Sequence, residues 1–459
     1  MKHLKLLILS AVAFSAAASA RPVHPPKHSA AQALFDGKTL NGWKRLGGTA
    51  DFKVENGTIV GTTVANSGNT FLTTEKEYGD FVLELDAMVE SKNGNSGVQT
   101  RSHYDTEGHT GKVYGRQMEI DPSDRSWTGG VYDEQRRQWI YPLDLHPQAK
   151  SAYNHGQYNH FKIECIGNEM KTWVNGVPVA YVIDTVDRKG FIGLQVHAIF
   201  SEGEAGKHIY FKNINIRTTN LKPEPFPKDV YVVDYVPNHL SEQEKLDGLK
   251  LLYNGHSPDG WISAKGTTFP QKGWDATHGT MTVFSSEGKE AANGGDIVTK
   301  DQFSAFDLSF EFKLSPGANS GVKYFVTLAE QVKGSNIGLE YQVLDDDLHP
   351  DAKLGRDGDR KLASLYDLFP SHKQKRFMHP IGEWNTGRIV VYPDNRIEHY
   401  LNGVKVLDYV RGSKEFMDAY LLSKYHIYPN FGLAKKGHIL LQDHGNLVSF
   451  RSIKIKELN

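Results

Sequence analysis

A repeated strand motif is the feature of this sequence that most constrains its fold. Residues 190–197 are Gly-Phe-Ile-Gly-Leu-Gln-Val-His, and residues 437–444 are Gly-His-Ile-Leu-Leu-Gln-Asp-His. Side chains alternate at a period of two along a strand, so the glutamine and the histidine of each copy share one face. The copies lie about 250 residues apart, which predicts a tandem duplication.

Other motifs repeat in the same order and support the duplication. Leu34-Phe-Asp-Gly precedes Trp43, and Leu252-Tyr-Asn-Gly precedes Trp261. Asn-Ser-Gly-Val follows an alternating apolar strand at residues 95–98 and again at 319–322. Many short strands separated by glycine-containing turns are typical of a β-sandwich. The sequence therefore predicts an all-β chain made of two tandem jelly-roll β-sandwiches.

The repeats also set the expected domain boundaries. The first unit is predicted at residues 33–218 and the second at 249–459, joined by a linker at 219–248. The linker begins with a stiff proline-rich stretch, Leu221 to Lys228. A short helix follows, with Ser241 and Glu244 as a capping box and Gly248 as its end. No sustained helical period is found elsewhere.

The N-terminal segment is typical of a secretory signal. Residues 1–20 combine Lys2 and Lys5, an apolar stretch and Ala18-Ser19-Ala20 before Arg21. We expect export to the periplasm or the extracellular space, without a transmembrane anchor, because the apolar stretch is too short to span a bilayer. The single cysteine, Cys165, excludes an internal disulfide, and its place on an alternating strand predicts a buried structural thiol.

Composition and motif searches exclude several function classes. The chain has 53 basic and 54 acidic residues, so nucleic acid is not expected as a partner. Nucleophile elbows, phosphate loops, HExxH and paired-cysteine zinc motifs are absent from the sequence. The acidic stretch Asp345 to Asp351 lacks the spacing and glycine of an EF-hand, which favours a solvated loop over a cation site.

Polar residues gather on one predicted face of each unit. A sheet ordinarily hides its apolar side and exposes its polar side, so these residues are expected on the outer face. Amides and carboxylates suit vicinal hydroxyls of a polyhydroxylated ligand, whereas ordinary solvated positions are the simpler alternative. The acid and the amide exchange places between the units, which the sequence does not explain. The residues are Gln99, Arg101, Gln117, Glu119, Asp121, Gln195 and His197 in the first unit, and Lys323, Glu340, Gln342, Gln442 and His444 in the second.

The repeated motifs resemble those of a known family, the 3-keto-disaccharide hydrolase domain. The resemblance is carried by Glu340-Tyr-Gln-Val-Leu-Asp, Ser364-Leu-Tyr-Asp-Leu, His399-Tyr-Leu-Asn-Gly-Val and Leu440-Leu-Gln-Asp-His-Gly in the second unit. The first unit matches through Gln117-Met-Glu-Ile-Asp-Pro-Ser and Leu194-Gln-Val-His, but has Ala198 where the family usually has glycine. The resemblance implies a concanavalin A-like jelly roll in each unit.

The resemblance also implies cleavage of glycosides that carry a ketone at sugar C3. Such a ketone acidifies the C2 proton, so a base can remove it, the C1 substituent can leave by β-elimination, and water can then add. An upstream sugar 3-oxidoreductase is implied as a partner, and the resemblance assigns no definite cofactor. A divalent metal held by Asp345, His349 or His444 is an alternative to a cationic side chain.

The implied roles follow from that chemistry. The bases or acids are His197 and His444, with Glu119 and Glu340 as carboxylate partners and Arg101 and Lys323 as enolate stabilisers. Tyr132 and Tyr366 are candidate proton donors, and the substrate-binding set is Gln99, Gln117, Asp121, Tyr132, Gln195, Gln342, Tyr366 and Gln442. Two other functions stay open: a noncatalytic, lectin-like pair of carbohydrate-binding modules, and an ordinary two-carboxylate glycosidase. Glu119 and Asp121 are too close in sequence to favour the last.

Overall fold

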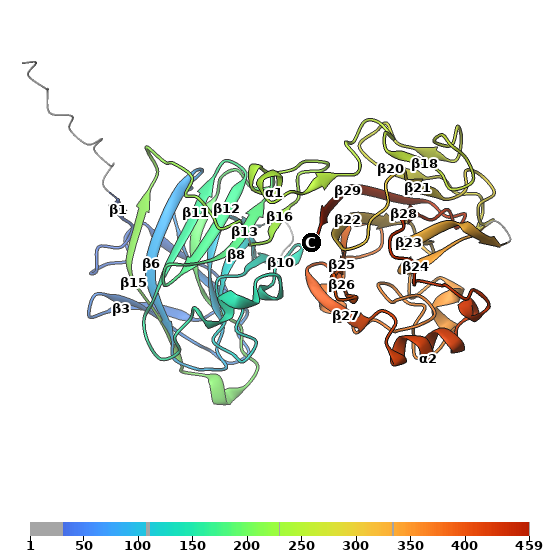
Figure 1. Cartoon of the computed structure of the whole chain (residues 1–459). Coiled ribbons are helices and arrows are strands. Elements are labelled where there is room, and N and C mark those ends of the chain that lie inside the picture. Colours follow the sequence, from blue (N-terminus) through green and yellow to red (C-terminus); the bar gives the residue numbers. More distant parts are fainter. Residues whose placement is uncertain (1–30, 107–110, 229, 333–334, 459) are drawn as a thin grey trace, which may run out of the picture.

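Two β-sandwiches lie side by side in the computed structural model, which describes residues 31–106, 111–228, 230–332 and 335–458 (Figure 1). The predicted signal segment lies outside these residues. Each unit consists of two packed sheets. The predicted fold class, all-β with two tandem concanavalin A-like jelly-roll sandwiches, is confirmed.

The first unit packs a nine-stranded sheet on a seven-stranded sheet. The nine-stranded sheet has the order β16-β13-β12-β11-β6-β15-β4-β3, with β1 beside β15. Its strands are β1 (Gln32–Ala33), β3 (Asp51–Glu55), β4 (Thr58–Thr62), β6 (Phe81–Val89), β11 (Asn159–Ile166), β12 (Glu169–Val174), β13 (Val177–Ile183), β15 (His208–Arg217) and β16 (Val232–Asp234). The seven-stranded sheet contains, in spatial order, β10 (Gln138–Tyr141), β9 (Val131–Glu134), β8 (Lys112–Ile120), β7 (Ser96–Asp105), β14 (Phe191–Val196), β5 (Thr70–Thr74) and β2 (Trp43–Gly47).

The second unit repeats this arrangement with eight and five strands. Its eight-stranded sheet contains β19 (Trp274–Asp275), β20 (Met281–Val283), β29 (Val448–Glu457), β22 (Phe306–Leu314), β25 (Asn385–Val391), β26 (Arg396–Leu401) and β27 (Val404–Val410), with β17 (Lys250–Leu251) beside β29. Its five-stranded sheet contains β18 (Trp261–Ser263), β21 (Ile297–Thr299), β28 (His438–Leu441), β23 (Asn319–Val332) and β24 (Ser335–Leu344).

Equivalent tryptophans support the duplication at the level of single hydrogen bonds. Trp43 and Trp261 are both buried, and their indole nitrogens donate to the carbonyl oxygens of Leu34 and Leu252 at 2.9 and 2.6 Å. Each indole thus fastens the opening turn of its unit to the apolar core. Cys165 is buried and free, as predicted for a structural thiol.

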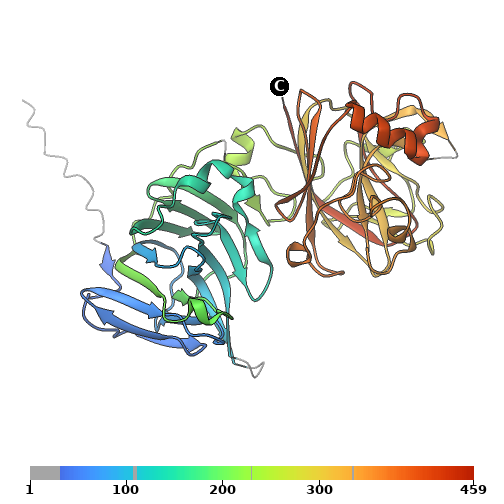
Figure 2. The ribbon, with the colours of Figure 1, turned by 90° about the horizontal axis from the view of Figure 1, so that it is seen from below.

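Two helices are described, and only the first was predicted. Helix α1 (Glu242–Leu246) begins with the expected capping box, in which Ser241 and Glu244 each accept the other's backbone N–H. Helix α2 (Lys414–Leu422) was missed because nine residues are too few to show a sustained helical period. Figure 2 shows α2 on the outside of the second unit. Among the described residues, no helix has the length and apolar character needed to cross a membrane.

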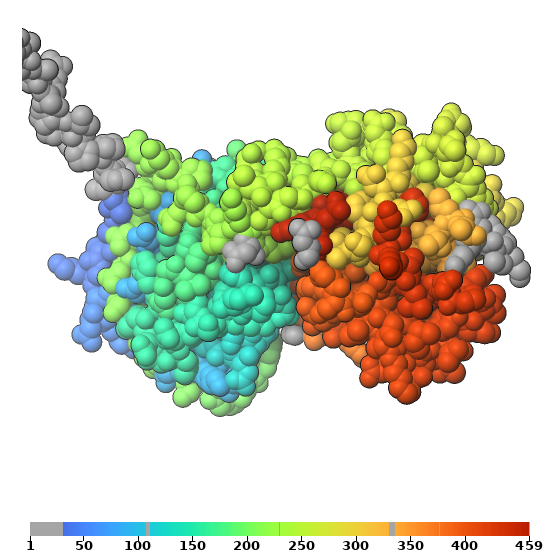
Figure 3. Space-filling model, viewed as in Figure 1, coloured from blue at the N-terminus to red at the C-terminus, as the bar shows by residue number. Residues whose placement is uncertain are grey.

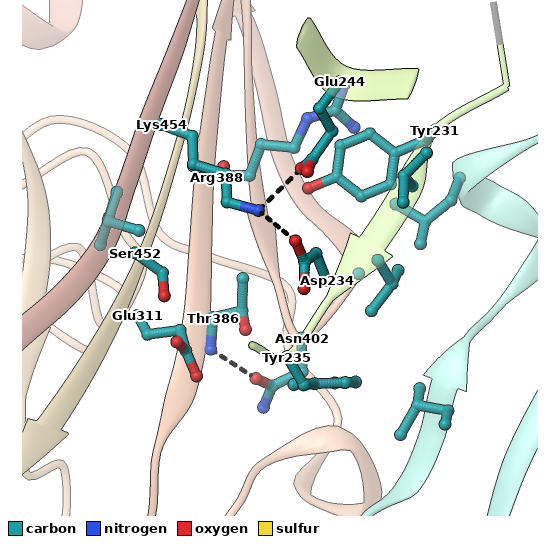
Figure 4. A pocket seen from close by; sticks show the side chains of 17 residues that line it. Tyr231, Asp234, Tyr235, Glu244, Glu311, Thr386, Arg388, Asn402, Ser452 and Lys454 are labelled. Carbon is teal, nitrogen blue, oxygen red and sulfur yellow. Dashed lines mark hydrogen bonds and ion pairs between the residues drawn. The ribbon is translucent and has the colours of Figure 1, made fainter. Parts of the chain in front are cut away.

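The segment predicted as a linker is attached to both units. Strand β16 pairs in parallel with β13 of the first unit. From the second unit, the buried Lys454 amine contacts the carboxylates of Glu244 and Asp234 at 2.7 and 3.3 Å, beside a small cavity of about 50 Å³ (Figure 4). The space-filling view shows the two units meeting below this segment (Figure 3). The linker is therefore packed against both units and does not hang free between them.

An aromatic side chain of the second unit also belongs to the core of the first. Phe377 is the last residue of the 3-10 turn Lys375–Phe377, and its ring centroid lies 5.9 Å from that of Trp127. Trp127 in turn makes an edge contact with Trp139 at 4.6 Å. His379 adds a hydrogen bond to the backbone carbonyl of Arg137 at 3.2 Å. These contacts couple the packing of the two units.

Removing the Phe377 ring should therefore destabilise the whole chain. We expect Phe377→Ala to lower the free energy of unfolding by about 3 kcal/mol, because it empties a buried aromatic position. Denaturant unfolding followed by tryptophan fluorescence measures the effect. Phe200→Ala is the matched control, since Phe200 is 85% exposed. Equal stabilities of the two variants would contradict the proposed coupling.

Candidate active site

A pocket of about 360 Å³ lies on the seven-stranded sheet of the first unit. Its floor comes from β8 and β14, and β9 and β10 supply one wall. Polar side chains dominate the lining, and their amides and carboxylates can form hydrogen bonds with a hydroxylated ligand. The lining residues are Asn69, Asn95, Gln117, Glu119, Arg125, Tyr132, Glu134, Gln135, Gln138, Trp139, Gln195 and His197.

The second unit has a pocket of about 210 Å³ at the equivalent place on its five-stranded sheet. Its floor comes from β23, β24 and the residues just after β28, and the turn after α2 supplies aromatic side chains. The lining residues are Glu290, Asn319, Lys323, Asn336, Ile337, Glu340, Gln342, Tyr366, Lys424, Tyr425, Tyr428, Gln442 and His444. The duplicated motifs therefore form duplicated pockets.

Cross-strand pairs explain why the acid and the amide exchange places between the units. In the first unit Gln99 is opposite Gln117, and its amide donates to the Gln117 Oε1 at 3.0 Å. In the second unit Lys323 is opposite Glu340, with Nζ and Oε2 3.8 Å apart. The first unit thus has an amide pair where the second has an ion pair. The acid of the first unit is Glu119, two residues after Gln117 on the same strand. Directly opposed side chains of a sheet pair in this way.

The glycine of each Asn-Ser-Gly motif makes room for the neighbouring polar side chain. A Cβ atom on Gly97 would lie 2.2 Å from the Gln117 side chain. A Cβ atom on Gly321 would lie 2.2 Å from the Glu340 Oε1 atom. The shared glycine therefore lets the side chain from the next strand lie flat over the pocket floor.

Gly321→Ala should displace the Glu340 carboxylate and weaken ligand binding to the second pocket. A methyl group at 2.2 Å from a carboxylate oxygen cannot be accommodated unless Glu340 moves away from Lys323. A crystal structure of the variant and titration of a sugar ligand would measure this. Gly266→Ala is the control in the same unit, because its nearest neighbour would be 3.5 Å away. An unmoved Glu340 with unchanged affinity would contradict the expectation.

Several buried polar atoms in both pockets have no hydrogen-bond partner among the described residues. In the first pocket these are Asn95 Oδ1 and Gln195 Nε2. In the second they are Asn319 Oδ1, Asn336 Oδ1 and Nδ2, Gln342 Oε1, Gln442 Oε1 and His444 Nδ1. Buried polar atoms are rarely left unpaired, and a cluster of them facing one cavity is typical of a site that a polar ligand completes.

Glu119 is a titratable acid near neutral pH. Burial raises the pKa of Glu119 to about 7, against hydrogen bonds from Asn95 and Gln117 that favour its charged form. Those bonds measure 2.5 Å to Oε1 and 3.1 Å to Oε2. A carboxyl group with such a pKa can both accept and release a proton at neutral pH, as general acid–base chemistry requires.

The second pocket holds a buried ion pair instead. Burial raises the pKa of Glu340, and the Lys323 amine opposes that effect. Burial by itself would lower the pKa of Lys323, but the carboxylates of Glu340 and Asp296 outweigh it and raise that pKa. The pocket floor therefore carries a cation beside an acid, which suits stabilisation of a negative oxygen.

Each pocket also contains the predicted histidine and tyrosine. The Nδ1 atom of His197 lies 2.7 Å from the Ala198 carbonyl and donates to it, which leaves Nε2 as the acceptor nitrogen. Burial lowers the pKa of His197, so the ring is neutral at pH 7. Burial raises the pKa of Tyr132 to about 12, and Tyr366 donates to the Asp351 carboxylate at 2.8 Å.

The structure corrects the expectation of an exposed polar face. Gln117, Gln195 and Gln342 are buried, as are Gln99 and Asp121. Gln99 lies opposite Gln117 on the neighbouring strand and does not line the pocket. Asp121 also does not line it; its carboxylate contacts the Arg125 guanidinium at 2.7 Å. Each of these two residues contacts a residue that lines the pocket, Gln117 or Arg125, without lining it itself.

Arg101 was wrongly predicted to stabilise a charge in the pocket. The register shifts between Thr100 and His103, and Arg101 has a φ of +48°, so a bulge breaks the alternation of faces. Its buried guanidinium binds the carbonyls of Gly79 and Gly167 and the carboxylate of Asp80. Arg125 provides the pocket cation instead, stacked over Trp139 at 4.8 Å.

Other pocket residues were missed because they lie on connecting segments. Arg125 follows β8, and Lys424 and Tyr425 follow the unpredicted helix α2. Periodicity assigns faces only within strands, so nothing in it places a loop residue over a sheet. Of the strings that carry the family resemblance, Gln117-Met-Glu-Ile-Asp-Pro-Ser ends just before Arg125 but does not include it.

A metal centre is not formed by the described residues. They contain no group of three or more His, Cys, Asp or Glu side chains arranged to hold a metal ion. The Asp345 carboxylate accepts from the backbone N–H groups of Gly317, Asp347 and Leu348. His349 and His444 contact each other with ring centroids 5.6 Å apart. Asp345 thus stabilises its own turn and does not face the pocket.

One known protein family matches this chain twice. The model of the 3-keto-alpha-glucoside-1,2-lyase-like domain matches residues 30–217 and again 248–456. A 3-keto-disaccharide hydrolase from Bacteroides thetaiotaomicron is 37% identical over 237 residues, covering 46% of this chain and 79% of the relative. A crystal structure of a glycosyl hydrolase candidate from Parabacteroides distasonis is 30% identical, with a TM-score of 0.43, covering 49% of this chain and all of that one.

The two family matches together span most of the sequence and coincide with the two sandwiches and their pockets. The chain therefore belongs to the 3-keto-alpha-glucoside-1,2-lyase-like domain family and carries two copies of its domain.

Proposed function

We propose that this chain is an exported hydrolase that cleaves 3-keto-glycosides by β-elimination and hydration. The observation that carries the proposal is the set of unpartnered polar atoms facing one pocket that also holds Lys323, Glu340 and His444. Family membership and the named hydrolase relative support the substrate class. An upstream sugar 3-oxidoreductase would supply the ketone.

The proposed reaction assigns each side chain a proton or a charge. A base removes the C2 proton, and the electron pair moves into the C3 carbonyl as an enolate. The enolate then re-forms the ketone while C1=C2 forms and the C1 oxygen leaves with a proton from an acid. Water finally adds its oxygen to C1 and a proton to C2.

The second pocket fits this scheme with named groups. The His444 ring is the proposed base, and the Lys323 cation faces the proposed enolate oxygen. Tyr366 or Glu340 would give the proton to the leaving oxygen. In the first pocket His197, Glu119 and Arg125 take the corresponding parts. We propose the second pocket as the fuller site because it holds a buried cation within 4 Å of its acid.

A substrate pair tests the proposal. The purified chain is incubated with a methyl 3-ketoglucoside and with the unoxidised methyl glucoside, and the released sugars are quantified. Cleavage of the keto compound alone supports the proposal. Cleavage of the unoxidised glycoside indicates an ordinary glycosidase, and binding without cleavage of either indicates a carbohydrate-binding module; both results would overturn the proposal.

A further inference from the structure

The second pocket contains an amine that the family motifs do not account for. Lys424 begins the 3-10 turn Lys424–Ile427 directly after helix α2. Its backbone N–H donates to the buried Asp367 carboxylate at 2.7 Å, which fixes the residue beside Tyr366. Its Nζ atom donates to the Tyr366 hydroxyl at 3.2 Å and lies 4.4 Å from the centre of that ring. The amine is thus held at the pocket wall.

This amine differs from the other lysine of the pocket. Lys323 is buried and forms an ion pair with Glu340. Lys424 is exposed overall. Among the described residues, none forms an ion pair with its amine, which instead donates to the Tyr366 hydroxyl. Burial of its amine lowers the pKa of Lys424, Glu340 opposes the effect, and the Lys323 and Arg360 cations add to it. A desolvated amine beside other cations is the arrangement that makes lysine nucleophilic.

We propose that Lys424 forms an imine with the ketone of a sugar bound in the second pocket. This inference rests on the proposed 3-keto substrate class and adds a covalent step to it. Lys424 first gives a proton to a neighbouring base, and its nitrogen adds to the C3 carbonyl carbon. The carbonyl oxygen takes up two protons and leaves as water. The sum is balanced: an ammonium group and a ketone give a protonated imine and one water.

The protonated imine would make the C2 proton more acidic than the ketone does. Removal of that proton gives a neutral enamine in place of an enolate, and Tyr366 stands next to the nitrogen to exchange protons. The first pocket lacks this option, since the cation in its lining is Arg125, whose guanidinium stays protonated and binds Asp121. The two pockets would therefore differ in mechanism.

Reductive trapping tests the inference. The full chain is incubated with a methyl 3-ketoglucoside and sodium cyanoborohydride, which reduces an imine to a stable amine. We expect the mass of the intact chain to rise by the mass of one methyl 3-ketoglucoside minus one oxygen atom. Peptide mapping should place the adduct on Lys424. Lys424→Arg, which keeps the charge, should abolish the adduct. Lys414→Arg, on exposed α2, should leave it unchanged.

The outcomes separate the inference from the proposed function. Cleavage of the keto compound without an adduct on Lys424, or with adducts spread evenly over surface lysines, would overturn the imine and leave the function standing. An adduct on Lys424 without any cleavage would support the imine and overturn the function.

Discussion

Replacing His197 and His444 together by alanine is expected to lower cleavage of a 3-keto-glycoside by about 10²–10⁴-fold, the usual contribution of a positioned acid or base. Both rings line their pockets, His197 with Nε2 as its acceptor nitrogen and His444 with a buried, unpartnered Nδ1. His444→Ala alone should remove most of the activity, because we propose the second pocket as the fuller site.

Steady-state kinetics of the two single variants and the double variant measures this effect. His278→Ala is a suitable control, since its exposed side chain contacts Asp275 far from either pocket lining. Full activity in the double variant would contradict the histidine assignment in both units. A larger loss in His197→Ala than in His444→Ala would instead place the main activity in the first unit.

The second large effect is a pH dependence at Glu119. Its pKa in the folded chain is about 7, above the ordinary value of 4.5, because burial disfavours its charge. Below pH 4.5 the carboxyl group is neutral in the folded and the unfolded chain, so its raised pKa does not change the free energy of unfolding. As the pH rises from 4.5 to about 7, the group ionises in the unfolded chain first, and the free energy of unfolding falls. Above pH 7 the free energy of unfolding is lower by about 3 kcal/mol than it is below pH 4.5 because of this one group.

Glu119→Gln should remove this dependence, since an amide keeps the shape without the ionisation. Compared with the unmodified chain, we expect equal stability at pH 4.5 and a more stable variant at pH 8. Denaturant unfolding at the two pH values measures the difference, with Glu202→Gln, on an exposed 3-10 turn, as the control. A variant whose stability follows that of the unmodified chain at both pH values would contradict a buried, titrating Glu119.

Period-two alternation correctly grouped most pocket residues on the strands. Gln195 with His197, Gln117 with Glu119 and Gln442 with His444 do line common pockets. The duplication made these assignments stronger, because the same pattern had to hold twice. The tryptophans that follow the two opening motifs also form equivalent hydrogen bonds.

The failures have identifiable physical causes. Arg101 lies beyond a bulge, which a sequence pattern of period two does not reveal. Gln99 is buried among hydrogen bonds with Gln117 and Ser102, and the turn after Asp121 encloses its carboxylate through Ser123 and Arg125. Lys424 and Phe377 lie on irregular segments, and their roles depend on tertiary contacts alone. Local patterns thus predicted the strands and their faces, but not what covers them.

Deuterium incorporation tests the proposed function most directly. Cleavage of a methyl 3-ketoglucoside in D₂O by elimination and hydration requires that C2 lose its proton and receive a deuteron from solvent. We therefore expect the released 3-ketoglucose to carry deuterium at C2 beyond the level of an enzyme-free control, as measured by mass spectrometry and NMR. Release of the sugar with its original C2 proton, at the control level of exchange, would contradict the account.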